Sequence, residues 1–564
     1  MNYLENYNFW KQSGLLADEI NELNLLADNA EELKSRFGND LEFGTAGMRG
    51  IMGIGCNRLN RYTVRRAAQG MAAWLSATDL PRKAAIGYDS RHNSRLFAEI
   101  CAVAFAEAGI HAYIFDRLAP TPMLSYAVRE LNCGCGIVIS ASHNAGAYNG
   151  VKCYGPDGCQ MTDEPAAIVT REIGKIPYFI PERKSFQEFI SDGLISYIKQ
   201  QLWEDYYNTV LSEAIEPEII SKAKLNIVYT PLCGTGNEPV RKVLGRLGVN
   251  ISVVACQEKP DGDFKTCEYP NPETDEALAE SYKVASKTGC DVILGTDPDC
   301  DRVAIAVPDG TGFKKLSGNE LGCLLLDYIL KQRTRKNDLP NGAIAVRSIV
   351  STPMADRIAD AYGVSVNAVL TGFKYIGGKI LELEQAGQSE RFVFGFEESC
   401  GYLKGTYARD KDAVVASMLV CELAAFLKLQ GLTILDALNE LYSTHGFYLS
   451  KVKSMELTGA DAMEKAAKLM SDLRDNPPQK IGGACVTAIK DYRASVEHDL
   501  TNDTNSEILL PKSNVLEFIL GTFGTVIVRP SGTEPKVKFY FTAVADTKDA
   551  AQELIHAMIF EMIK

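Results

Sequence analysis

The sequence contains no run approaching the roughly 18 apolar residues that a membrane-spanning helix needs. Its first twenty residues carry acidic side chains and no apolar core run, so we expect no secretory leader. With 46% hydrophobic and 23% charged residues, the composition is typical of a soluble globular protein. A chain of 564 residues exceeds what one hydrophobic core usually supports, which predicts several domains.

The sequence also lacks any Cys-x-x-Cys pair, although it has 15 cysteines. Disulfide frameworks and structural zinc sites use paired cysteines at short spacings. An odd number of scattered cysteines instead predicts reduced thiols and a cytoplasmic location.

No stripe of Lys and Arg is present, and the net charge is −13. This balance disfavours binding to duplex nucleic acid. The sequence has no Walker phosphate loop and no G-x-S-x-G elbow, which disfavours nucleotide hydrolysis and serine-hydrolase chemistry. An anionic ligand would therefore be bound by short local clusters of Arg, Lys and Gly.

What the sequence does contain is one pattern repeated three times: strand, helix, strand, helix, strand, and then a polar loop. Such alternation predicts βαβ units with parallel strands, whose ligands bind beyond the carboxyl ends of the strands. The predicted segments are Lys83–Gly87, Ser94–Ala108, Ile110–Phe115, Met123–Leu131 and Gly136–Ser140; then Leu225–Tyr229, Asn237–Leu247, Ile251–Val254, Thr274–Thr288 and Asp291–Leu294; then Ala343–Val346, Pro353–Tyr362, Val364–Val369, Ile376–Glu384 and Arg391–Phe394.

After about Gly446 the pattern changes to strands with a helix between them and a closing helix. This order predicts an α+β domain. The predicted segments are Phe447–Glu456, Ala460–Arg474, Cys485–Asp491, Val515–Leu520, Thr525–Arg529, Val537–Thr542 and Lys548–Ile563.

The first polar loop, Ser140-Ala-Ser-His-Asn144, follows a buried strand. A hydroxyl such as that of Ser142, in an exposed loop, can act as a nucleophile if it has a base or a preloaded phosphate. For a lone serine, however, an ordinary loop position explains the residue equally well.

The second loop alternates Asp297, Asp299 and Asp301. In an extended loop these carboxylates would point the same way, and three converging carboxylates repel unless a cation neutralises them. Mg²⁺ suits them because it is a hard cation that prefers oxygen ligands. An EF-hand is excluded, since its sixth and twelfth positions would be Arg302 and Pro308.

The third loop offers Glu397, Glu398 and Ser399, whose carboxylates and hydroxyl can hydrogen-bond sugar hydroxyls, whereas the two carboxylates would repel a phosphate. Taken alone, a helix-capping turn explains this loop equally well. The fourth, Arg529-Pro-Ser-Gly-Thr-Glu-Pro-Lys536, combines a guanidinium, hydroxyls and glycine-exposed amides, which indicates an anion site.

Two further basic residues complete the set: Arg49 in a glycine-rich segment, and Lys152 shortly after Ser142. Either could neutralise a transferring phosphoryl group or move a proton.

These loops, in this order from about Phe43 to Lys536, resemble those of the α-D-phosphohexomutase superfamily, in particular its phosphoglucomutase- and phosphopentomutase-like subgroup. The resemblance implies an α/β fold of three similar α/β domains, with mixed and largely parallel sheets, and a C-terminal TATA-binding-like α+β domain. We expect these four domains at residues 1–208, 209–317, 318–442 and 443–564.

The resemblance also implies roles for individual residues. Ser142 would carry the phosphoryl group, and one Mg²⁺ per chain would bind three aspartates and the phosphoserine. The implied catalytic residues are Ser142, Arg49, Lys152 and His143; the implied metal ligands are Ser142, Asp297, Asp299 and Asp301; the implied substrate contacts are Thr371, Gly372, Lys374, Glu397, Ser399, Lys411, Arg529, Ser531, Gly532 and Thr533.

The function implied is interconversion of glucose 1-phosphate and glucose 6-phosphate, with glucose 1,6-bisphosphate as intermediate and activator. Mannose and pentose phosphates stay open as substrates, because no residue is assigned to the sugar O2. We expect sugar phosphates as the partners, with no nucleic acid and no membrane, and no oligomeric state is indicated. Two different functions also stay open: a phosphatase with Asp297 as nucleophile, and a non-catalytic sugar-phosphate-binding regulator.

Overall fold

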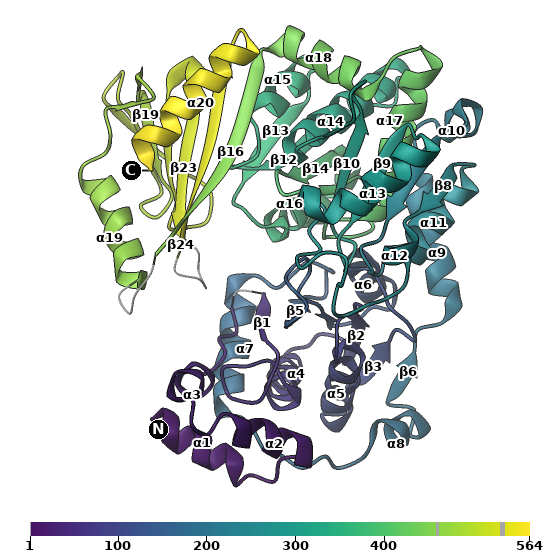
Figure 1. The fold of residues 1–564 in the computed structure, drawn as a ribbon, viewed down its shortest axis with the longest axis vertical. Helices are drawn as coiled ribbons and strands as arrows, with labels where there is room; N and C mark the ends of the chain where they lie inside the picture. The colour runs from purple at the N-terminus through teal and green to yellow at the C-terminus, as the bar shows by residue number, and fades with distance from the viewer. Residues whose placement is uncertain (1, 45, 458–461, 531–535, 564) are drawn as a thin grey trace.

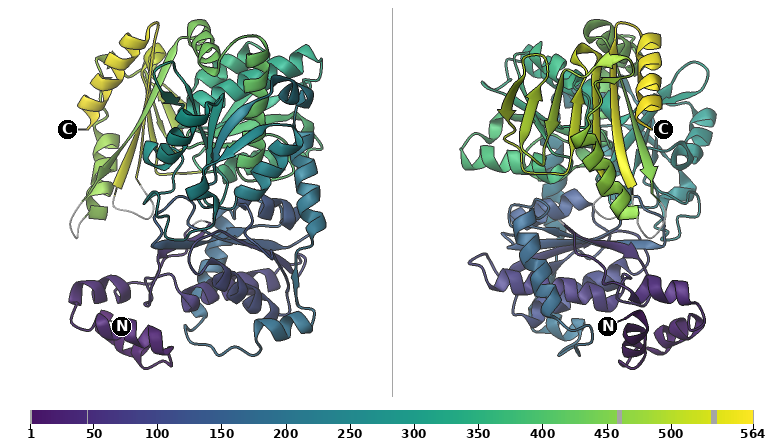
Figure 2. Two further views of the ribbon diagram at one scale, coloured as in Figure 1. Left: turned by 45° about the vertical axis from the view of Figure 1, so that its right-hand side comes forward. Right: turned by 90° about the vertical axis from the view of Figure 1, so that its left-hand side faces the viewer.

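The computed structural model describes residues 2–44, 46–457, 462–530 and 536–563. These residues form four sheet-based domains, which Figure 1 shows in chain order as purple and blue, teal, green, and yellow-green to yellow. The first domain lies below the others in this view, and the C-terminal domain lies beside the third (Figures 1 and 2).

The first three domains repeat one sheet topology. The orders β5-β4-β2-β3, β10-β9-β7-β8 and β15-β14-β12-β13 each contain three parallel strands and one antiparallel strand. Strands β1, β6 and β11 extend the first two sheets at their edges. The threefold repeat and the mixed, largely parallel sheets expected from the sequence are therefore confirmed.

The helices and strands predicted from the sequence have observed bounds close to the predicted ones, whereas the other elements, such as those before β2, were not predicted. In the first domain the elements are α1 Tyr3–Lys11, α2 Ala17–Leu25, α3 Ala30–Phe37, β1 Gly47–Ile51, α4 Arg61–Ser76, β2 Lys83–Tyr88, α5 Ser94–Glu107, β3 His111–Ile114, α6 Thr121–Glu130, β4 Cys135–Ile139, β5 Tyr148–Tyr154, α7 Asp163–Lys175, α8 Phe186–Ser191, β6 Ile195–Tyr197 and α9 Gln200–Ser212. Those of the second are α10 Pro217–Ala223, β7 Asn226–Thr230, α11 Asn237–Arg246, β8 Asn250–Val253, α12 Ala255–Glu258, α13 Asp275–Thr288, β9 Val292–Thr296, β10 Val303–Pro308 and β11 Phe313–Lys315.

The third domain contains α14 Gly318–Arg335, β12 Ile344–Ser348, α15 Met354–Asp360, β13 Ser365–Val369, α16 Phe373–Gln385, β14 Phe392–Glu397, β15 Gly401–Leu403, α17 Ala413–Leu429 and α18 Ile434–His445. The fourth contains β16 Phe447–Glu456, α19 Ala462–Asp475, β17 Lys480–Ile481, β18 Ala484–Cys485, β19 Ala488–Asp491, β20 Val496–Asp499, β21 Thr504–Glu507, β22 Leu516–Ile519, β23 Gly524–Pro530, β24 Lys536–Ala545 and α20 Lys548–Met562.

In each repeat, the polar loop connects the last parallel strand to an antiparallel return strand: β5, β10 or β15. Each of these tight connections contains one non-glycine residue in the left-handed region: Ser142 (φ 51°), Cys300 (φ 55°) and Cys400 (φ 60°). Residues other than glycine rarely adopt this backbone conformation, and those that do are often found at functional sites. The three loops therefore share a backbone geometry as well as a place in the fold.

The fourth domain is an antiparallel sheet in the order β16-β24-β23-β22-β19-β20-β21. Helices α19 and α20 pack on one face around Phe518, Phe539 and Phe541. The other face contacts the third domain, where Ile527 and Tyr540 meet Ile349 and Leu370. This arrangement confirms the predicted α+β domain.

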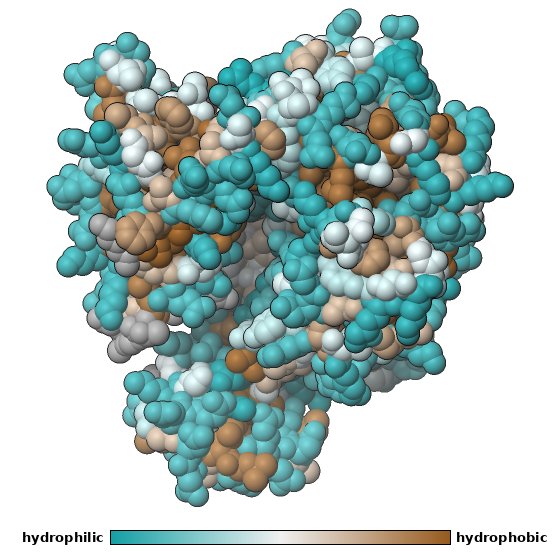
Figure 3. All heavy atoms as spheres, turned by 45° about the horizontal axis from the view of Figure 1, so that its top comes forward, coloured by the Kyte–Doolittle hydropathy of each residue, from teal (hydrophilic) through white to brown (hydrophobic). Residues whose placement is uncertain are grey.

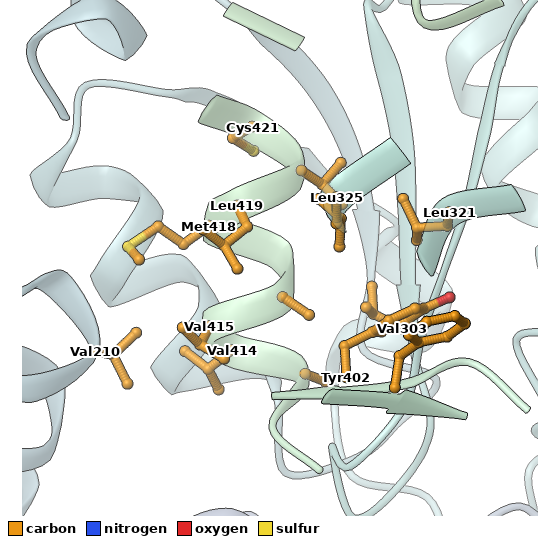
Figure 4. Close-up of a cluster of buried hydrophobic side chains, with 14 of the residues drawn as sticks. Val210, Val303, Leu321, Leu325, Tyr402, Val414, Val415, Met418, Leu419 and Cys421 are labelled. Atoms are coloured by element: carbon orange, nitrogen blue, oxygen red, sulfur yellow. The ribbon is translucent and has the colours of Figure 1, made fainter. Parts of the chain in front are cut away.

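Helix α17 joins the second and third domains. Asp412 caps it by accepting the N–H groups of Val414 (2.7 Å) and Val415 (3.2 Å), and residues 413–425 are buried. Although α17 follows β15 in the third domain, it also packs on β9, β10, α10 and α11 of the second. Figure 4 shows its apolar side chains surrounded by those of neighbouring elements. The two domains therefore share one core.

Among the described residues, no single helix is long and apolar enough to span a membrane. Helices α17 and α18 meet the length and composition criteria only together, and the pair is bent by 89°.

Candidate active site

Ser142 lies in the connection between β4 and β5 and is only 3% exposed. Its Oγ donates a hydrogen bond to Asp297 Oδ2 (2.6 Å) and lies 3.1 Å from His143 Nδ1. The expectation of an exposed loop is therefore wrong, because the acidic loop of the second domain packs directly over the serine. This contact brings together two sequence motifs that are 155 residues apart.

Asp297, Asp299 and Asp301 are buried, and one carboxylate oxygen from each lies within 4.8 Å of the others. Their backbone forms a turn through left-handed Cys300 rather than the extended loop that we expected. In the described part of the chain, Asp299 Oδ1 and Asp301 Oδ1 are buried without a hydrogen-bond partner. Unsatisfied, converging carboxylate oxygens fit a hard divalent cation.

Two lysines from other domains reach the same acidic cluster. Lys152 Nζ lies 2.6 Å from Asp299 Oδ2 and 3.0 Å from Asp301 Oδ2, and Lys411 Nζ lies 3.2 Å from Asp301 Oδ2. Burial and the neighbouring carboxylates raise the pKa of Asp297. Burial would also raise the pKa of Asp299, but Lys152, Asp297 and Lys411 together lower it. Arg302 Nε also lies 3.7 Å from Asp301 Oδ1. Asp299 Oδ1 and Asp301 Oδ1 nevertheless have no hydrogen-bond partner among the described residues, so both remain available to a cation.

Arg49 and His143 flank the serine. Arg49 lies on strand β1 opposite Gly150, not in the glycine-rich loop that we expected, and its Nη1 donates to Asn144 Oδ1 (2.8 Å). Burial, reinforced by Arg302 and Arg49, lowers the pKa of His143 well below its usual value. His143 is therefore neutral at physiological pH.

The loop between β14 and β15 connects the acidic cluster to the segment Thr371–Tyr375. Glu397 Oε1 accepts the N–H of Gly372 (2.7 Å), and the Lys411 ammonium partly offsets the rise in the pKa of Glu397 that burial causes. The Ser399 carbonyl accepts from Arg302 Nη1 (3.2 Å). Among the residues that the structure describes, Thr371 Oγ1 is a buried hydroxyl without a partner.

A cavity of about 480 Å³ lies between the first, third and fourth domains, and Thr371, Lys374 and Arg529 line it. Figure 3 shows the molecule hollowed between its lobes on this face. Lys374 Nζ pairs with Asp163 Oδ1 of the first domain (2.7 Å). The cavity thus joins two of the implied substrate contacts, Thr371 and Lys374, with Arg529 of the expected anion site. The other expected residues of that site, Ser531, Gly532 and Thr533, lie outside the described residues.

Three residues of the site were not identified from the sequence. Thr121, in the first domain, donates a hydrogen bond from its hydroxyl to Asp299 Oδ2 (3.0 Å). Arg302 is held charged by Glu273 and Asp301, which raise its pKa although burial would lower it. Lys538 pairs in register with Arg529 on the adjacent strand. The alternation Lys536-Val-Lys538 signals one basic strand face, whereas nothing in the sequence links Thr121 to Asp299.

We expect the protonation of Glu398 to make the thermal stability of the protein depend on pH. Its carboxylate accepts hydrogen bonds from Ser348 (3.0 Å) and Ser351 (3.3 Å), and burial together with Glu397 raises its pKa to about 7. The pKa of Glu398 is higher in the folded protein than in the unfolded chain, so the protonated carboxyl stabilises the fold. This stabilisation is complete at a pH below the pKa of the unfolded chain and is lost as the pH rises through about 7. We expect the melting temperature of Glu398→Gln to fall less between about pH 5 and about pH 8 than that of the wild type.

Thermal unfolding across this pH range tests the prediction. Glu390→Gln, which alters an exposed carboxylate, is the matched control and should follow the wild type. Parallel curves for wild type and Glu398→Gln would contradict it.

Comparison with known proteins agrees with this geometry. Models described as phosphoglucomutase/phosphomannomutase alpha/beta/alpha domains I, II and III match residues 40–178, 204–310 and 317–445, and the C-terminal domain model matches residues 479–559. A phosphoglucomutase of Staphylococcus aureus is 38% identical over 94% of both chains.

Two solved structures share the fold. A phosphoglucomutase/phosphomannomutase family protein from Burkholderia thailandensis superposes with a TM-score of 0.66 at 18% identity, over 93% of this chain and 96% of that one. The open form of parafusin from Paramecium gives 0.67 at 17% identity, over 94% of both chains. The chain thus belongs to the phosphoglucomutase/phosphomannomutase family, and it is an isomerase of the phosphosugar mutase type.

Proposed function

We propose that the protein interconverts glucose 1-phosphate and glucose 6-phosphate, with Ser142 as the phosphoryl carrier and glucose 1,6-bisphosphate as intermediate and activator. The main support is the hydroxyl of Ser142, 2.6 Å from Asp297 in a buried cluster of three carboxylates on another domain. Relatives named phosphoglucomutase, 37–38% identical to this chain, support glucose as the sugar.

In the first transfer, the bond between phosphorus and Ser142 Oγ breaks as a sugar hydroxyl forms a new bond to phosphorus. The hydroxyl proton must leave the sugar, and Ser142 Oγ must gain one. Neutral His143, whose Nδ1 lies 3.1 Å from Ser142 Oγ, can move a proton to or from that oxygen. Lys152 is protonated, since Asp299 and Asp301 raise its pKa despite burial, and therefore suits neutralisation of the phosphoryl group.

Asp297, Asp299 and Asp301 would hold one Mg²⁺ per chain, with a phosphoserine oxygen of residue 142 as a further ligand. When bound, Mg²⁺ would offset the negative charge that develops on the transferring phosphoryl group. The Lys411 ammonium, 3.2 Å from Asp301 Oδ2, supplies a further positive charge beside this metal site. The burial of Ser142 keeps water away from the phosphoserine.

A second anion site is needed, because one phosphate must be held while the other reacts. Arg529 and, opposite it, Lys538 supply its charge, and we assign Ser531, Gly532 and Thr533 to the same site. Glu397 and Ser399 would bind sugar hydroxyls in either orientation, with Thr371, Gly372 and Lys374 contacting the substrate beside them. The bisphosphate can then reverse between two fixed phosphate positions.

The experiment that tests this function compares kcat/KM on glucose 1-phosphate, mannose 1-phosphate and ribose 1-phosphate. We expect glucose 1-phosphate to be preferred. Preference for another sugar would show that the same mechanism acts on that sugar phosphate, and no turnover of any of them would favour a binding protein.

The fifteen cysteines are free thiols, which supports our proposal of a cytoplasmic location.

Replacing Arg529 by alanine should mainly raise KM. Arg529 would contact the non-reacting phosphate both before and during transfer, so its loss weakens ground and transition states alike. A charged hydrogen bond of this kind is worth about 1.5–3 kcal/mol. Steady-state kinetics on glucose 1-phosphate measure the change, with the exposed Arg493→Ala variant as control. A fall in kcat with unchanged KM would place Arg529 at the reacting phosphate instead.

Replacing Lys152 by alanine should have the opposite effect and lower kcat with little change in KM. The ammonium lies at Asp299 and Asp301, where the transferring group would be neutralised. The same assay decides, with Lys175→Ala on the exposed face of α7 as control. A rise in KM alone would show that Lys152 binds substrate and does not assist transfer.

A further inference from the structure

Arg91, in the connection between β2 and α5, has a fully buried side chain and belongs to none of the motifs discussed above. Its guanidinium donates to four backbone carbonyls of the segment that carries the nucleophile. Nη2 donates to the carbonyls of Ser142 (2.6 Å) and Asn144, and Nη1 donates to those of Ala145 (2.8 Å) and Tyr148 (3.0 Å). One side chain thus binds both ends of the turn that presents the Ser142 hydroxyl.

Four converging carbonyl oxygens require this particular side chain. Buried carbonyls need donors, and the planar guanidinium carries five N–H groups in a fixed arrangement. A lysine ammonium is a compact charge with three donors and cannot reproduce that geometry. Asp89 lies on the other side of the guanidinium, with Oδ2 3.3 Å from Arg91 Nε, and its Oδ1 accepts the backbone N–H of Arg91 (2.9 Å).

The conformation that Arg91 holds is an unfavourable one. Ser142 has φ 51°, in the left-handed region that non-glycine residues avoid. Such residues persist where surrounding contacts over-determine the backbone. Without the four hydrogen bonds, the turn has less to keep Oγ directed at Asp297.

The second domain contacts Arg91 and the serine turn together. The Phe264 ring centroid lies 4.9 Å from Arg91 Cζ, and Asp263 Oδ1 lies 2.6 Å from His92 Nε2. A Cβ added to Gly146 would lie 2.7 Å from the Gly262 carbonyl oxygen, so these backbones are closely packed. The segment 262–264 therefore supports the turn from the domain that also carries the acidic cluster.

We propose that Arg91 is a positioning residue for phosphoryl transfer, which fixes the backbone of residues 142–148 so that Ser142 Oγ faces the acidic cluster, and that Phe264 connects this function to the second domain. The proposal rests on the proposed function of Ser142. The hydrogen bonds of Arg91 go to backbone, not to a reacting atom, so the residue acts through the turn.

Hydrogen exchange tests the positioning directly, on the full-length protein without substrate. In Arg91→Met and in Arg91→Lys, we expect amides of residues 142–149 to exchange at least about tenfold faster, while β2 and α5 stay unchanged. Arg95→Met, on the exposed side of α5, is the control and should match the wild type. Unchanged exchange in the turn, or a general increase in both variants, would overturn the proposal.

Kinetics on glucose 1-phosphate provide the second test. A misplaced reacting group costs on the order of 100-fold in rate, so kcat should fall by about that factor in both Arg91 variants with KM nearly constant. Wild-type kcat in Arg91→Lys would show that the charge alone matters and would refute positioning. If wild-type protein does not convert glucose 1-phosphate, the proposed function fails, yet the exchange result still decides whether Arg91 orders the turn.

The role of the second domain is tested by Phe264→Leu, which keeps an apolar side chain but removes the ring. Because both residues would act through one contact, the kcat losses of Arg91→Lys and Phe264→Leu should combine less than multiplicatively in the double variant. Fully multiplicative losses would show that Phe264 does not act through Arg91.

Discussion

Replacing Ser142 by alanine should reduce turnover of glucose 1-phosphate by about four orders of magnitude or more. In enzymes with a covalent intermediate, removal of the nucleophile causes losses of this size or greater. The variant has no hydroxyl to accept the phosphoryl group, although every cation around it remains. Alanine removes only one oxygen, so we expect no large change in melting temperature.

The matched control for this variant is Ser142→Gly. Glycine accepts the left-handed conformation of residue 142 without strain, whereas alanine does not. If loss of the hydroxyl is responsible, both variants should be inactive. Recovery of activity in Ser142→Gly, or turnover of Ser142→Ala within about tenfold of wild type (roughly 1.4 kcal/mol), would contradict the assignment.

The same preparations separate the mutase from a phosphatase with an aspartate nucleophile. After incubation with glucose 1,6-bisphosphate, peptide mass spectrometry of the wild type should place phosphate on Ser142. Phosphate on Asp297 would favour the phosphatase. The short contact between these two side chains makes the direct measurement necessary, since a reacting phosphate would touch both.

Removal of divalent cations by EDTA should abolish activity, and Mg²⁺ should restore it. Three buried carboxylates have ligand atoms within 4.8 Å of one another, and two of them have an oxygen without a hydrogen-bond partner among the described residues. Such a cluster is costly to keep together without a cation. Asp299→Asn replaces one anionic ligand by a neutral one and should weaken metal binding. Full activity in the presence of chelator would show that the cluster is only structural.

Thermal unfolding gives a test of the metal site that does not depend on activity. A ligand that binds only the folded state raises the melting temperature, and the shift grows with the ratio of its free concentration to its Kd. Added Mg²⁺ should therefore stabilise the wild type more than Asp299→Asn. Asp309→Asn, in an exposed turn after β10, should respond like the wild type. An equal shift in all three proteins would place the bound Mg²⁺ elsewhere.

The features predicted correctly from the sequence are those that short segments encode. Apolar strands alternating with helices mark the threefold repeat, and Asp297, Asp299 and Asp301 lie close in the chain as well as in space. The return strands β5, β10 and β15 were not identified as strands, since pairing with the preceding strand defines them more than their residue pattern does.

Long-range contacts account for what the sequence did not reveal. Ser142 was expected to be exposed because nothing near it in the chain indicates that the second domain covers it. Arg91 and Thr121 look like ordinary residues of a strand-to-helix connection and a helix start. Their importance comes from partners at Ser142 and Asp299, 51 and 178 residues away.

The buried helix α17 limits how this protein can be recombined. The order of the chain suggests four domains that could be exchanged one at a time. However, α17 follows the strands of the third domain and fills part of the core of the second domain. A chimera that takes its third domain from another mutase would bring a foreign helix into the second, where its side chains would meet a core shaped for different ones. The second and third domains should therefore be inherited, and engineered, as one block.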